Sequence, residues 1–141
     1  MKLELTRRYA FAASHRLHSP QLDDAENQRV YGKCNNPYGH GHNYIVEVTV
    51  TGPVDSATGM IAHLGELDGF VNRQVIEPFD HTYLNKDVPV FRQCVPTTEN
   101  LCMEIFDRLK NFPSARLVRI RLEETGRNSF EYAGDQNGSH P

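Results

Sequence analysis

Residues 40–51 alternate apolar and polar side chains, and this pattern constrains the fold more than any other feature of the sequence. Tyr44, Val46, Val48 and Val50 share one parity, and polar residues fill most positions of the other. A period of two predicts a β-strand with one buried face. Extended backwards, the buried parity includes His40 and His42. The strand is therefore expected to carry two imidazoles on its inward side.

The rest of the chain predicts an α+β domain. The expected elements, in chain order, are a strand over 3–13, a long loop over 16–41, a strand over 44–50, helices over 64–79 and 97–112, and strands over 118–122 and 130–132. The order is ββααββ, an antiparallel sheet with two helices on one face. Such a sheet leaves two edges to be covered or paired, which favours self-association. We expect one domain over 1–134 and a disordered tail over 135–141.

Composition narrows the function classes. A net charge of -3 argues against broad binding to nucleic acid, because phosphate-binding surfaces need an excess of Lys and Arg. The sequence has no apolar run of membrane-spanning length, and its start lacks a signal-peptide pattern. Cys34, Cys94 and Cys102 are odd in number and form no CxxC pair, so neither a disulfide framework nor a cysteine-rich zinc site is expected. These features favour a cytoplasmic protein.

Three histidines are candidate metal ligands. His40 and His42 are two apart, so in an extended chain their Cα atoms lie roughly 6–7 Å apart and both rings point to one side. His15 shares the inward parity of Phe11 and Ala13 at the end of the first strand. Three imidazoles with one open position are typical of catalytic zinc. The alternative is that the HGH segment is a polar strand start and His15 a hydrogen-bonded core residue.

Two further groups are candidates for the site. Glu124 has the parity of Ile120 and Leu122, so it either ends the buried face, where it would need donors or a cation, or turns into water at a frayed strand end. Asp80 and His81 follow the first long helix. Such a pair can transfer protons, although on its own it more often forms a surface turn.

Eight segments together form a recognisable pattern: residues 11–17 (FAASHRL), 31–37 (YGKCNNP), 40–44 (HGHNY), 55–60, 80–81, 84–89, 97–100 (TTEN) and 124–125. In this pattern the chain resembles the 6-pyruvoyl-tetrahydropterin synthase family. The resemblance runs in order from about Arg7 to Gly134. It implies the T-fold, also called the tunnelling fold, in which three subunits join their sheets edge to edge into a barrel and two trimers form a homohexamer.

The resemblance also implies a reaction and roles for residues. The reaction removes triphosphate from 7,8-dihydroneopterin triphosphate and rearranges the side chain, without an external redox cofactor. His15, His40 and His42 would hold Zn²⁺, and Cys34 would be the general base. Asp80 and His81 of a neighbouring subunit would complete a proton relay. Glu124 would anchor the pterin's amino-pyrimidine edge, and three further residues would frame the pocket: Thr97, Thr98 and Glu99.

Three other functions compete with this interpretation. In 6-carboxytetrahydropterin synthase, of queuosine biosynthesis, the Cys lies closer to HGH after a shorter loop, whereas here His40 follows Cys34 by six positions and the loop from Ser19 to Lys33 is present. An aldolase-like branch carries Glu in place of Cys34. A non-catalytic zinc-stabilised module would leave Cys34 and Glu124 without a role and would be expected to close its fourth ligand position.

Overall fold

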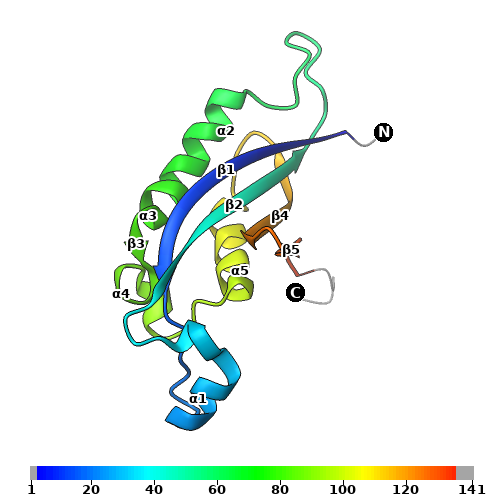
Figure 1. Cartoon of the computed structure of the whole chain (residues 1–141). Coiled ribbons are helices and arrows are strands. Elements are labelled where there is room, and N and C mark those ends of the chain that lie inside the picture. The colour runs from blue at the N-terminus through cyan, green and yellow to red at the C-terminus, as the bar shows by residue number, and fades with distance from the viewer. Residues whose placement is uncertain (1–2, 136–141) are drawn as a thin grey trace.

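The structure is a computed structural model and describes residues 3–135. These residues form one curved sheet covered by helices on one face (Figure 1). The strands are β1 (Glu4–His15), β2 (His40–Thr51), β3 (Thr82–Tyr83), β4 (Arg116–Thr125) and β5 (Asn128–Tyr132). The sheet order is β3-β1-β2-β4-β5, and only the β1–β3 pairing is parallel. The predicted antiparallel α+β sheet is confirmed, with β3 as an addition.

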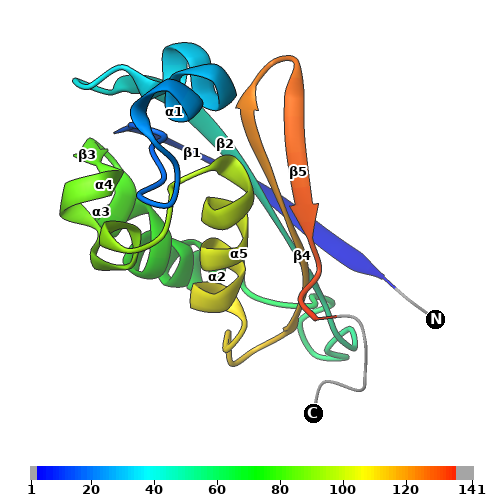
Figure 2. The ribbon, with the colours of Figure 1, turned by 90° about the horizontal axis from the view of Figure 1, so that it is seen from below.

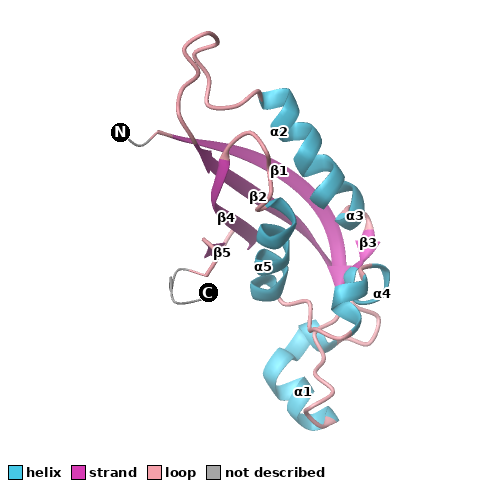
Figure 3. Cartoon of the chain, turned by 180° about the vertical axis from the view of Figure 1, so that it is seen from behind, coloured by secondary structure: helices cyan, strands magenta, loops and turns pink. Residues whose placement is uncertain are grey.

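Two long helical segments cover the inner face of the sheet (Figures 2 and 3). The first runs without a break through α2 (Leu64–Val71), a π-helical turn (Asn72–Ile76) and α3 (Glu77–Phe79). The second is α5 (Thr98–Leu109), where the Thr97 hydroxyl accepts a hydrogen bond from the Asn100 amide at 3.2 Å and caps the helix. Both agree with the predicted helices. Short α4 (Leu84–Asp87) and a 3₁₀ turn (Pro89–Arg92) lie between them in the chain.

The predicted loop over 16–41 is wrong in part, because it contains α1 (Asp24–Tyr31) and a 3₁₀ turn (Gly32–Asn35). Asp23 caps α1 by accepting a hydrogen bond from the Glu26 amide at 2.8 Å. The buried residue of this helix is the polar Asn27. Its Oδ1 atom accepts a hydrogen bond from the Ser19 amide, and its Nδ2 atom donates to the carbonyl oxygens of Ser19 and Asp23. The helix therefore has no apolar stripe by which periodicity could reveal it.

The core lies between the sheet and the helices and consists mostly of the residues that the alternation predicted. Val46, Val48 and Val50 of β2 are at most 1% exposed. Phe11 and Tyr44 face each other across β1 and β2 and stack with ring centroids 5.1 Å apart. None of the helices in residues 3–135 is long and apolar enough to cross a membrane. The expected tail falls almost wholly on residues 136–141, which lie outside the described part.

Candidate metal and catalytic site

The pairing of β1 with β2 brings the three histidines together. His15 lies opposite His40 in the register, and Ala13 lies opposite His42. The Nε2 atoms of His15 and His40 are 3.1 Å apart, and those of His42 and His40 are also 3.1 Å apart. The inward parity read from the sequence therefore leads to three imidazole nitrogens converging on one point at the end of the sheet.

His15 is held with its Nε2 lone pair free for a ligand role. It is fully buried, and burial lowers its pKa to about 4, so the ring is neutral. Its Nδ1 atom lies 2.9 Å from the carbonyl oxygen of Pro96, which can only accept, so Nδ1 carries the proton. A metal-bound histidine commonly donates its other N–H to such an acceptor. The Tyr44 hydroxyl also lies 3.3 Å from Nδ1.

A zinc ion fits this donor set. Ligand atoms at ~2.0–2.1 Å from a tetrahedral ion lie roughly 3.3 Å from one another, close to the observed separations. Hydrogen bonding alone accounts poorly for the cluster, because a single proton on His40 Nε2 can be donated to only one of its two neighbours. A cation at the centre would satisfy all three nitrogens.

Cys34 and Glu124 flank the histidines on two sides. The Cys34 sulfur and ring nitrogens of His15 and His40 lie within 4.8 Å of one another. A Glu124 carboxylate oxygen lies 3.5 Å from His42 Nε2 and 3.9 Å from His15 Nε2. The Glu124 side chain is 15% exposed, so it faces the cluster and does not turn into water. Each side chain therefore lies near enough to contact, or itself occupy, the fourth ligand position of a metal bound by the three histidines.

Burial and the Glu124 charge together raise the pKa of the Cys34 thiol. A bound cation acts in the opposite direction, because it stabilises the thiolate. Burial lowers the pKa of His42 and so favours its neutral, ligating form. The neutral form that metal binding requires is therefore favoured at His15 and His42, whereas Cys34 depends on a nearby positive charge to become a thiolate.

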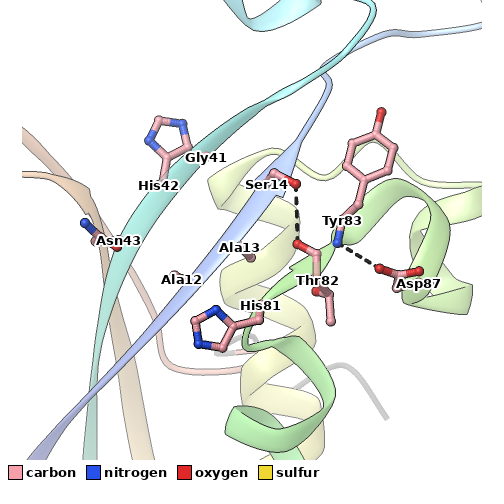
Figure 4. A pocket seen from close by; sticks show the side chains of 10 residues that line it. All are labelled: Ala12, Ala13, Ser14, Gly41, His42, Asn43, His81, Thr82, Tyr83 and Asp87. Atoms are coloured by element: carbon pink, nitrogen blue, oxygen red, sulfur yellow. Dashed lines mark hydrogen bonds between the residues drawn. The ribbon is translucent and has the colours of Figure 1, made fainter.

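Asp80 and His81 lie where the chain enters β3 beside β1. One Asp80 carboxylate oxygen accepts a hydrogen bond from the Ala12 amide at 2.9 Å, and the other lies 3.5 Å from His81 Nε2. The His81 side chain is 82% exposed and borders a pocket of about 590 Å³, which His42 also lines (Figure 4). Within residues 3–135, neither residue has a hydrogen bond or ion pair with the three histidines.

The predicted pocket residues at the start of α5 have different environments. Thr97 is the helix cap and Glu99 is exposed. Thr98 is 2% exposed, and its hydroxyl has no hydrogen-bond partner within residues 3–135. Sequence reasoning missed two groups behind His15, the Pro96 carbonyl and the Tyr44 hydroxyl. The parity of Tyr44 with His42 was a usable signal for the second, whereas a backbone acceptor leaves no mark in the sequence.

Comparison with known proteins agrees with this architecture. Residues 4–135 match the family model described as 6-pyruvoyl tetrahydropterin synthase. A 6-pyruvoyl tetrahydrobiopterin synthase of Poecilia reticulata is 50% identical over 93% of this chain and 90% of its own length. The Homo sapiens protein of the same name is 46% identical over 94% and 92%.

The solved structure of Caenorhabditis elegans 6-pyruvoyl tetrahydropterin synthase superposes with a TM-score of 0.89 at 40% identity, covering 96% of this chain and 97% of that one. Sequence and fold thus agree over nearly the whole length. The chain belongs to the 6-pyruvoyl tetrahydropterin synthase family and has its T-fold.

Proposed function

We propose that this chain is a zinc-dependent 6-pyruvoyl-tetrahydropterin synthase, a lyase that removes triphosphate from 7,8-dihydroneopterin triphosphate in the cytoplasm. The observation that carries the proposal is the convergence of three imidazole nitrogens, at 3.1 Å separations, around a buried His15 whose Nδ1–H is directed to Pro96. His15, His40 and His42 would hold the ion, which when bound supplies Lewis acidity to the oxygens of the substrate side chain.

Cys34 takes the substrate's side-chain proton in this proposal. It lies beside His15 and His40, on the 3₁₀ turn that follows α1. A positive charge at the histidines would oppose the effect of burial on its pKa and yield a thiolate. Asp80 and the exposed His81 would come from a neighbouring subunit; within residues 3–135 they have no hydrogen bond or ion pair with the three histidines of their own chain.

Glu124 would orient the pterin. A carboxylate can accept two parallel hydrogen bonds from the amino-pyrimidine edge, and Asn128 Nδ2 already lies 3.3 Å from Oε1. The nearness of Glu124 to His42 and His15 offers a second role as a fourth metal ligand. The buried Thr98 hydroxyl, which has no hydrogen-bond partner in the described part of the chain, is a further group for the pocket frame, next to Thr97 and Glu99.

The proposed assembly is a homohexamer built as two stacked trimers. β3 pairs with only Ala13 and Ser14 of β1, so most of the outer edge of β1 lacks a strand partner within the described chain. β5 forms the other sheet edge. Edge-to-edge pairing of subunits would satisfy both edges. Light scattering of the purified protein tests the assembly, and a monomeric mass at working concentration would contradict it.

Two alternatives are tested separately. A 6-carboxytetrahydropterin synthase would release acetaldehyde from the same substrate. A non-catalytic zinc-stabilised module would have its fourth position closed, and Cys34 and Glu124 both lie near enough for that role. Removal of the metal by a chelator should abolish turnover, and zinc should restore it. A protein that binds zinc and pterin tightly without any turnover would be the module.

A further inference from the structure

A second pocket, of about 320 Å³, lies next to the candidate metal site. Its walls are the chain that follows β1 and the segment around the 3₁₀ turn that precedes α5. Its polar lining includes Arg16, His18, Asn85, Arg92 and Gln93. None of its lining residues carries a carboxylate. The pocket is therefore positively charged in a protein whose net charge is -3.

The cations of this pocket are fixed in place by neutral partners. Arg16 Nε donates to the Asn35 carbonyl at 3.1 Å. The Arg16 backbone amide donates to Asn85 Oδ1 and the Arg16 carbonyl accepts from Asn85 Nδ2, both at 2.8 Å. Arg92 Nε donates to the Lys86 carbonyl at 3.1 Å. Neither arginine has an ion pair within residues 3–135. The Arg16 guanidinium uses Nε for the Asn35 carbonyl, so its planar fork of terminal N–H groups is available to an anionic ligand.

Hydrogen bonds join the segment after β1 that lines this pocket to the backbone around the candidate base, Cys34. The Leu17 amide donates to the Cys34 carbonyl at 2.7 Å, and the Asn35 side-chain amide donates to the Leu17 carbonyl at 2.8 Å. Asn35 Nδ2 also lies 3.2 Å from His18 Nδ1, which leaves Nε2–H of a neutral His18 as a donor. Pro96 lines the pocket, and its carbonyl accepts from His15. The pocket and the metal site therefore share walls.

We propose that this pocket is the subsite for the triphosphate group of the substrate. This inference rests on the proposed function, in which the triphosphate is attached to the same short side chain whose oxygens the metal binds. Glu124, the carboxylate beside His42 and His15, would repel a polyanion. Arg16 and Arg92 offer the planar donor forks that bind phosphate oxygens in pairs. A volume near 300 Å³ is at the lower end of small-molecule sites.

The test compares ligands with and without the triphosphate on zinc-loaded protein. The ligands are 7,8-dihydroneopterin triphosphate, 7,8-dihydroneopterin and inorganic triphosphate as a competitive inhibitor. Arg16→Gln and Arg92→Gln should each weaken the two triphosphate-containing ligands about tenfold or more, and leave the affinity for 7,8-dihydroneopterin unchanged. Arg73→Gln, at an exposed position on the π-helical turn, is the matched control and should change nothing. Zinc content is measured after each titration.

Two results would overturn the subsite. One is unchanged binding of triphosphate in both Arg16→Gln and Arg92→Gln. The other is a loss in Lys33→Gln instead, which would move the anion to the pocket of about 470 Å³ beside His40. Because Arg16 also supports the Cys34 segment, Arg92→Gln decides the matter if Arg16→Gln fails to fold. Arginine-dependent binding of inorganic triphosphate without pterin turnover would keep the subsite and reject the proposed reaction.

Discussion

The Nδ1 atom of His15 lies 2.9 Å from the carbonyl oxygen of Pro96, the residue that precedes the cap of α5. This contact links the end of β1 to the start of a helix 81 positions later in the chain. Asn100, in the first turn of α5, donates from its side chain to the Val95 carbonyl at 2.8 Å and so fixes the segment that carries the acceptor. The orientation of one candidate ligand thus depends on the helix cap.

The three histidines should bind about one zinc per chain. His42→Ala removes one of three neutral donors, so metal content and activity should both be lost. His63→Ala, an exposed histidine ahead of α2, is the control and should keep both. Metal analysis of dialysed protein measures the outcome. Full zinc occupancy in a His40→Ala, His42→Ala double variant would refute the metal assignment.

Cys34→Ala should keep the fold and the zinc but lose most turnover, because a general base contributes about 10²–10⁴-fold. Cys102→Ala is the control, since that sulfur is buried against β4 and β5 and has no role in the reaction. Initial rates at saturating substrate give the comparison. Near-normal turnover of Cys34→Ala would place the base elsewhere, with His81 as the first alternative.

Glu124→Gln should raise KM about tenfold or more while zinc stays bound, because an amide offers one acceptor and one misplaced donor to the pterin edge. Glu123→Gln is the neighbouring control, since Glu123 lies 3.8 Å from Arg121 and belongs to the other parity of β4. Substrate affinity and zinc content are measured together. Loss of zinc in Glu124→Gln would identify this carboxylate as the fourth ligand instead.

Acid stability should depend on Asp68. Arg7 and Tyr9 donate hydrogen bonds to its carboxylate at 2.7–2.9 Å and lower its pKa from 3.8 to about 2. A depressed folded-state pKa stabilises the protein above the unfolded value, and this stabilisation is lost as the pH falls from about 4 to about 2. In Asp68→Asn, Tm should be lower at neutral pH and fall less over this interval.

Asp107→Asn, which makes the same charge change at an exposed position of α5, is the control for that measurement. Thermal unfolding between pH 2 and pH 7 gives the Tm profiles. Parallel profiles for wild type and Asp68→Asn would show that the ion pair contributes no pH-dependent stability.

Arg7 interrupts the apolar parity of β1. Its ion pair with Asp68 on α2 accounts for this interruption.

The sequence predicted what short-range periodicity encodes. The alternation of β2 located the core face and, with it, the side of the sheet on which His40 and His42 lie. It could not predict β3, because two residues carry no period and their pairing with Ala13 and Ser14 is a tertiary contact. The sequence did not predict α1 because this polar helix has no apolar stripe. The distance from Glu124 to His42 depends on the β2–β4 register, which shifts at a bulge near Thr49.

The most direct test is the identity of the products formed from 7,8-dihydroneopterin triphosphate by the zinc-loaded protein. Mass spectrometry identifies the pterin, and separate assays measure triphosphate and acetaldehyde. The expected products are 6-pyruvoyl-tetrahydropterin and stoichiometric triphosphate, with little acetaldehyde. Stoichiometric acetaldehyde with a carboxypterin, or formation of a hydroxymethylpterin, would contradict it.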